Sequence, residues 1–80
     1  MSTDELDNDA LDAAILDAHA RDDRNALAKL YGEAADLAEA KGDIDGCCFF
    51  LTQAYVFALH AGAPEANALH DRLLAYGREE

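Results

Sequence analysis

The side chains best suited to chemistry are two adjacent cysteines and two histidines, Cys47, Cys48, His60 and His70. A thiolate beside an imidazole is the arrangement that nucleophilic catalysis needs, and the same atoms are common zinc ligands. However, a cysteine on the apolar face of a helix is ordinarily inert packing, and no C-x2-C or H-x3-H spacing brings metal ligands together. We therefore expect no catalytic residue, no metal and no cofactor, and we keep a thiol- or metal-dependent enzyme as a minority alternative.

Carboxylates are abundant, but their placement does not suit acid–base catalysis. The chain of 80 residues carries 17 acidic and 6 basic side chains, a net charge of −11. The predicted helices place these carboxylates on solvent-facing sides, without a hydrophobic pocket that would raise the pKa of one of them. Because such a charge is repelled by phosphate backbones and anionic lipids, we expect binding neither to nucleic acid nor to membranes.

Localisation follows from the cysteines and from the N-terminal segment. Cys47 and Cys48 are neighbours, and helical neighbours point about 100° apart, so we expect reduced thiols rather than a disulfide. The N-terminus shows no basic segment followed by an apolar run, and no apolar stretch approaches about 18 residues. These features predict a cytoplasmic protein.

The elements that must position these side chains are all helical. Alanine is frequent while valine and isoleucine are scarce, which favours an all-α fold. We predict four antiparallel helices in a single domain over residues 1–80, with residues 1–8 frayed or partly disordered. The first predicted helix covers residues 2–20, or starts near Asn8, and the second runs from the RDDRN connector, where Asp22 or Asp23 can cap it, to about Lys41. The third covers about Ile44 to Ala61, with Asp43 as its N-cap and Gly62 at its end, and the fourth follows Pro64.

The helix over residues 44–61 is predicted to be central, because polar residues occupy only about a third of its circumference at 100° per residue. Phe49 and Val56 fall among those polar positions, seven residues apart, and should form one exposed apolar patch. A core of this size rarely supplies more than ~3–5 kcal/mol, so the thin core and the patch together predict a homodimer. The candidate partner-binding residues are Tyr31, Phe49, Gln53, Val56 and His60.

The segment from Ala28 to Ala54 resembles a tetratricopeptide repeat (TPR), a helical hairpin that stacks into superhelices and binds proteins or peptides. The matching features are an early aromatic and a small residue in the first helix, a KGDID turn, and a small, large, small series in the second helix: Tyr31, Ala35, Ile44, Cys47, Leu51 and Ala54. Ala34, Ala38 and the late Pro64 depart from the family pattern. The resemblance implies a single divergent repeat capped by the first and last helices, and an unrelated helical bundle stays open as the alternative.

Taken together, these features predict a small acidic, non-enzymatic protein–protein interaction module, an adaptor or regulatory subunit that self-associates. Its partner would be a protein or peptide, with basic partners favoured by electrostatic steering. The alternative is an acidic regulator that uses the carboxylates of the first helix to mask a basic, nucleic-acid-binding surface.

Overall fold

Four helices make up the described part of the chain. The computed structural model describes the backbone of residues 3–77 and the side chains of residues 10–77. The helices are α1 (Thr3–Ala20), α2 (Arg24–Ala40), α3 (Ile44–Ala61) and α4 (Glu65–Ala75), and no strand occurs within this range. The all-α prediction is therefore confirmed. Residues 1–2 and the charged end at 78–80 lie outside the described residues, so the predicted fraying of residues 1–8 stays a prediction.

Local side-chain signals explain where the helices begin and end. The carboxylate of Asp23 accepts a hydrogen bond from the backbone N–H of Ala26 at 3.1 Å, and that of Asp43 accepts one from Gly46 at 2.9 Å. Each bond satisfies a helical N–H that has no backbone partner in the first turn. Gly62 ends α3 in the left-handed conformation, with a φ of 68°. That conformation is unfavourable for residues with a Cβ, which explains why glycine occupies this position.

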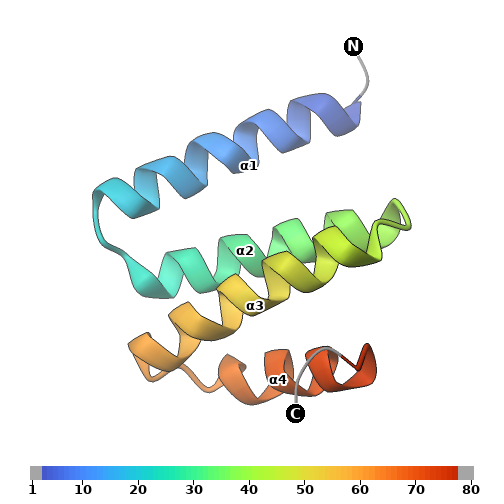
Figure 1. The fold of residues 1–80 in the computed structure, drawn as a ribbon. Coiled ribbons are helices and arrows are strands. Elements are labelled where there is room, and N and C mark those ends of the chain that lie inside the picture. Colours follow the sequence, from blue (N-terminus) through green and yellow to red (C-terminus); the bar gives the residue numbers. More distant parts are fainter. Residues whose placement is uncertain (1–2, 78–80) are drawn as a thin grey trace.

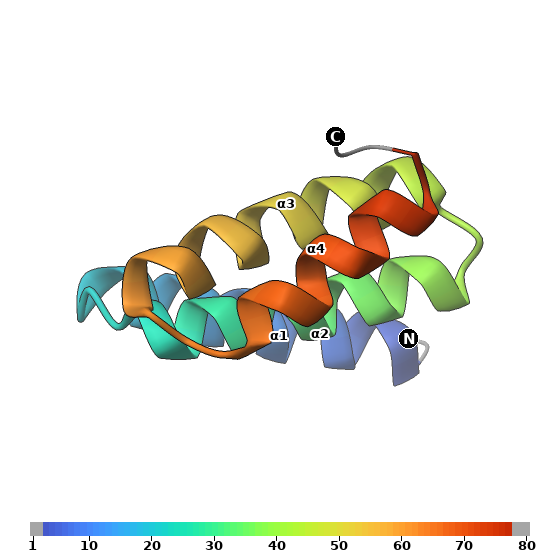
Figure 2. The same cartoon turned by 90° about the horizontal axis from the view of Figure 1, so that it is seen from below.

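The four helices form a flat molecule around a central hairpin. Contacts between consecutive helices dominate the packing: α1 lies against α2, α2 against α3, and α3 against α4. Figure 1 shows that the chain reverses direction at each connection, so that neighbouring helices run in opposite directions. Seen from below in Figure 2, α3 lies on one side of the layer formed by α1 and α2, and α4 runs obliquely beside it. The molecule measures 39 × 31 × 14 Å.

The core is built mostly from small side chains at the crossing of α2 and α3. Ala35, Cys47, Leu51 and Ala54 are fully buried, and Leu73 of α4 closes the same cluster. Small residues at a helix crossing allow the two backbones to approach closely. The predicted role of α3 as the central helix agrees with this packing, because α3 contacts both α2 and α4.

The structure corrects one expectation about a single residue and decides another. The count of polar and apolar positions around the central helix places Leu59 on its covered part, but Leu59 is 53% exposed, one turn beyond Val56 on the outer side of α3. Gly32 could mark a close approach of another helix or be a tolerated weakness; nothing lies within 4 Å of the position a Cβ would take, which supports the second alternative. Its lost helix propensity, about 1 kcal/mol relative to alanine, is tolerated without such a contact.

The apolar character of α3 also exceeds what we expected. By length and composition alone, this helix of 18 residues could cross a membrane, although no apolar stretch of that length was expected. The central helix of a soluble bundle meets the same criterion. Packing between α2 and α4 accounts for the buried 28% of this helix, whereas the apolar side chains on its outer side stay exposed.

Candidate interaction surfaces

An uncharged strip runs along the outer side of α3. We call it the α3 stripe, and it consists of Phe49, Thr52, Gln53, Val56, Leu59 and His60. Phe49 is 54% exposed and Val56 is 38% exposed, which confirms the predicted exposure of this pair. No Asp, Glu, Lys or Arg occurs between Gly46 and Ala61. The stripe therefore carries no carboxylate, ammonium or guanidinium group on a strongly acidic protein, and it exposes the apolar side chains of Phe49, Val56 and Leu59. Exposed apolar patches commonly mark sites of protein association.

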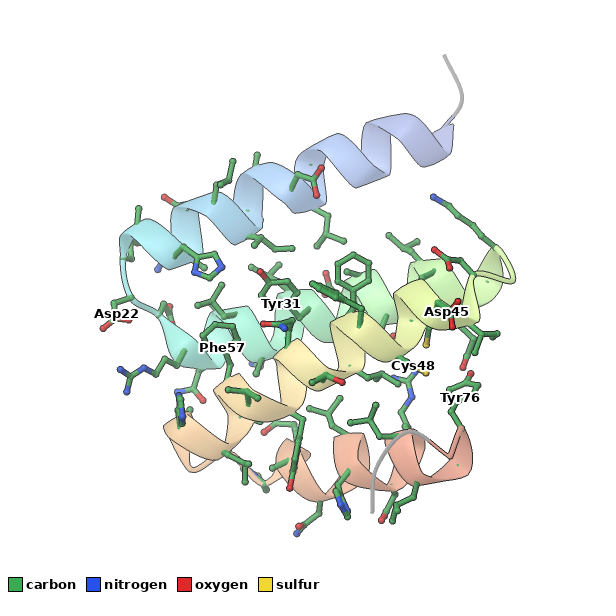
Figure 3. The ribbon with its side chains drawn as sticks, in the orientation of Figure 1. Asp22, Tyr31, Asp45, Cys48, Phe57 and Tyr76 are labelled. Carbon is green, nitrogen blue, oxygen red and sulfur yellow. The ribbon has the colours of Figure 1, made fainter. Side chains whose placement is uncertain are left out.

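Tyr31 does not join this stripe. Its ring stacks on Phe57 with a centroid distance of 5.8 Å and an interplanar angle of 4°, and it lies 6.2 Å from the ring of Phe50. The Nε2 atom of His19 lies 3.1 Å from the hydroxyl of Tyr31. Figure 3 shows Tyr31 and Phe57 directed toward each other between their helices. Tyr31 is therefore half-buried where α1, α2 and α3 meet, separate from Phe49 and Val56. We call the cluster of His19, Tyr31, Phe50 and Phe57 the aromatic joint.

Sequence reasoning places Phe50 and Phe57 on the apolar part of the central helix, but it does not bring them together with Tyr31 and His19. It places His19 away from the centre of the apolar face of the first helix, and in the structure the ring of His19 meets Phe57 edge-on at 5.7 Å. Phe50 and Phe57 are seven residues apart, and this spacing could have identified a second aromatic row on α3. The row faces α1 and α2, whereas the row of Phe49 and Val56 faces outward.

Two grooves flank α2 on the side that faces away from α3. The α1–α2 groove has a volume of about 540 Å³ and is lined mainly by Ala10, Leu11, Ala14, Leu30 and Leu37. The α2–α4 groove has a volume of about 290 Å³. Glu33 and Asp36 line both grooves, so the exposed side of α2 forms an acidic ridge between them.

Helix α4 is tied to this ridge by polar contacts. Arg72 places its Nη2 atom 2.9 Å from Asp36 Oδ1 and 3.8 Å from Glu39 Oε2. The hydroxyl of Tyr76 donates a hydrogen bond to Glu39. This bond, together with burial and the nearby negative charge, raises the pKa of Tyr76 to about 12. Figure 3 shows Tyr76 projecting from the end of α4 toward the hairpin.

The residues considered for catalysis and metal binding lie in different surroundings. Cys47 and Cys48 are free, buried thiols, and burial raises the pKa of Cys47, which keeps it in the poorly nucleophilic thiol form. His60 is exposed on the α3 stripe, whereas the ring of His70 lies against Tyr55 at 5.3 Å. Among the described side chains, no group of three or more His, Cys, Asp or Glu residues is placed to hold a metal ion.

Comparisons with known proteins do not assign the chain to a family. No family model matches it, and no significant match was found among curated proteins or solved structures.

Proposed function

We propose that this protein is a non-enzymatic protein–protein interaction module, acting as an adaptor or regulatory subunit, and that the α3 stripe is its principal binding surface. The observation that carries the proposal is the exposure of Phe49, Val56 and Leu59 in one row. Aromatic and aliphatic side chains at the centre of an interface supply most of its binding energy. We place this activity in the cytoplasm, in keeping with the buried free thiols.

The partner of the stripe includes a second copy of the same chain. In a molecule with a net charge of −11, two copies repel each other over most of their surfaces. The stripe is a place where they can meet without bringing carboxylates together, because α3 carries no acidic residue after Asp45. A two-fold arrangement would place Phe49 of one copy near the His60 end of the other stripe. This contact would bury apolar surface that the thin monomeric core leaves exposed.

We further propose that the α2–α3 hairpin is a single divergent TPR. The support is the short connection at Gly42 and Asp43 and the complete burial of Ala35, Cys47, Leu51 and Ala54 where the two helices cross. In this interpretation α1 and α4 cap the hairpin as half repeats. A repeat of this kind needs neighbours to cover its faces, which agrees with self-association.

The test compares two variants that introduce the same charge at exposed apolar positions. Phe49→Glu changes the stripe, whereas Leu16→Glu changes a leucine of α1 that is 71% exposed and lies outside the stripe. In sedimentation equilibrium at micromolar concentration, we expect a dimer for the wild type and for Leu16→Glu and a monomer for Phe49→Glu. A wild-type monomer, or equal loss of association in both variants, would contradict self-association through the stripe.

The effect of salt concentration on partner capture distinguishes the acidic-regulator alternative from this proposal. Capture of a partner that survives high salt but is lost in Phe49→Glu supports the apolar stripe, because apolar contacts are not screened. Capture by the wild type that falls steeply with salt and is unaffected by Phe49→Glu supports the masking of a basic surface instead.

A further inference from the structure

We propose a second binding site, the α1–α2 groove, and infer that it takes a basic amphipathic helix from another protein. The apolar side chains of such a helix would enter the groove, and its lysine or arginine side chains would pair with the acidic ridge of α2. This site lies on α1 and α2, away from the α3 stripe, so it extends the proposed function to a second partner class.

The shape of the groove suits a helix. Its floor is apolar and half-buried, formed by Leu11 and Ala14 of α1 and by Leu30 and Leu37 of α2. Leu30 and Leu37 are seven residues apart, so they repeat along α2 at the two-turn spacing of an amphipathic partner. A volume of about 540 Å³ accommodates several aliphatic side chains, and Leu30 and Leu37 lie about 10 Å apart along α2, so the apolar floor is about two helical turns long.

The charge of the rim selects a basic partner. Glu33 and Asp36 stand along one side of the groove, Asp36 is already paired with Arg72 of α4 at 2.9 Å, and the molecule as a whole is strongly acidic. Glu33 is therefore the rim carboxylate on which a basic partner chiefly depends. An acidic helix would bring carboxylates against carboxylates, and a second copy of this chain would do the same. Lysine or arginine side chains would instead pair with the rim and would also speed association by electrostatic steering.

Helix α4 packs against the hairpin in the way proposed for the partner helix, with apolar side chains inward and a basic side chain on the acidic ridge. It buries Ala66, Leu69 and Leu73 and directs Arg72 to Asp36 and Glu39 on the ridge. The α2–α4 groove and the α1–α2 groove share Glu33 and Asp36, so the ridge presents carboxylates to both sides of α2. On one side of α2, helix α4 already packs as an amphipathic helix with an arginine. On the other side, the groove between α1 and α2 is lined by no basic side chain among the described residues.

The probe is a fluorescein-labelled helical peptide of about 18 residues, composed of leucine, alanine, lysine and arginine, with leucines at i, i+3, i+4 and i+7. Two companion peptides separate the contributions: one has the leucines replaced by serine, and the other has the basic residues replaced by glutamate. Fluorescence anisotropy at 0.15 M salt should show binding of the first peptide alone.

Two charge-matched variants locate the site. Glu33→Lys reverses a charge on the rim, and Asp71→Lys makes the same change at an exposed position of α4 outside both grooves. We expect Glu33→Lys to weaken binding about tenfold or more and Asp71→Lys about twofold or less, because distant charges are screened. Circular dichroism should show both variants folded, since lysine is a good helix former at either position.

The outcomes distinguish this inference from the α3 stripe. Equal weakening by Glu33→Lys and Asp71→Lys, or equally tight binding of the serine peptide, would overturn the site and leave only net-charge attraction. Loss of binding in Phe49→Glu with no change in Glu33→Lys would also overturn it, because the peptide would then occupy the stripe. Unchanged peptide binding in Phe49→Glu supports two separate surfaces, whatever that variant does to self-association.

Discussion

The two helices that flank the hairpin differ in how completely they cover it. Helix α4 has 11 residues, yet it buries Ala66, Leu69 and Leu73 and adds ionic and phenolic contacts to α2. Helix α1 has 18 residues, but Ala18 is its only fully buried side chain among those described, and Leu16 is 71% exposed. The shorter helix therefore closes its side of the hairpin, and the longer helix leaves a groove.

The difference follows from the side chains that each helix presents. Large residues of α4 point inward at positions 69 and 73, one turn apart, and Arg72 beside them reaches the acidic ridge. The inner face of α1 combines Leu11 and Ile15 with Ala14 and Ala18, and each of the two alanines contributes only a single methyl group. Less apolar area is buried per turn, and the hydrophobic stabilisation falls in proportion. Stability thus resides on the α4 side, and space for a partner resides on the α1 side.

The largest expected effect is on the α4 side, and truncating one leucine on each side shows the contrast. Leu73→Ala removes a fully buried side chain and should lower the free energy of unfolding by about 2–5 kcal/mol. Because a core of this size supplies only ~3–5 kcal/mol, a loss at the upper end of this range would leave most of the variant unfolded at room temperature. Leu11 lines the α1–α2 groove, so Leu11→Ala should lower the free energy of unfolding by only about 1 kcal/mol. Urea denaturation followed by circular dichroism measures both.

Leu74→Ala is the control for this pair, since Leu74 is the next residue of α4 and is 44% exposed. Its truncation should change the unfolding free energy by less than about 0.5 kcal/mol. If Leu11→Ala proves as damaging as Leu73→Ala, then α1 is packed as tightly as α4, and the contrast between the two sides is wrong.

The features that could be predicted from the sequence are the local ones. Asp43 as an N-cap, Gly62 as a left-handed helix end and the boundaries of α3 each depend on a few adjacent residues, and the structure confirms all three. The outward direction of Phe49 and Val56 needed only the 100° rotation per residue. These features do not depend on how the helices pack, so a single sequence is sufficient for them.

Features that join distant residues could not be predicted in this way. The contact of His19 with Tyr31 and the pairing of Arg72 with Asp36 depend on the angles at which α1 and α4 cross α2. Ridge-into-groove packing permits several crossing angles for helices rich in alanine, and the sequence pattern does not choose among them. The α1–α2 groove was missed for the same reason, because it arises from how far α1 stands from α2.

An intermediate effect is expected at high pH, on the α4 side alone. The pKa of Tyr76 is raised from 10.0 to about 12 in the folded protein, chiefly because its hydroxyl donates to Glu39. Since the raised pKa favours the protonated phenol, the associated stabilisation is fully present below pH 10 and is lost as the pH rises through 12. Wild-type unfolding free energy, measured from neutral pH to pH 12, should fall more steeply than that of Tyr76→Phe.

Tyr55→Phe is the matched variant, because it removes a tyrosine hydroxyl of α3 without touching Glu39. General alkaline destabilisation affects all three proteins, so the informative quantity is the difference between each variant and the wild type. A wild-type curve that runs parallel to that of Tyr76→Phe would show that the phenol does not link α4 to α2 in solution.

The smallest expected effect lies on the α1 side, at the pair formed by His19 and Tyr31. Their side chains are joined by an exposed contact of 3.1 Å, so His19→Ala should lower the unfolding free energy by about 0.5–1 kcal/mol. The change should be concentrated in α1, because this contact is one of the polar contacts that hold the end of α1 to α2, beside the ion pair of Arg21 with Asp23. Limited trypsin digestion reports this directly, since Arg21 and Arg24 lie in and beside the α1–α2 connection. We expect faster cleavage there in His19→Ala.

His60→Ala separates loss of this contact from a general effect of removing a histidine, because His60 is exposed on α3. It should leave cleavage at Arg21 and Arg24 unchanged. Tyr31→Phe should accelerate cleavage as His19→Ala does, and the double variant should add little, since both changes remove the same contact. Additive acceleration would mean that the two residues hold α1 independently, through ring packing against Phe57 rather than through the polar contact. In that case the α1 side would be closed by aromatic packing, and its looseness would be confined to the half of α1 that lines the groove.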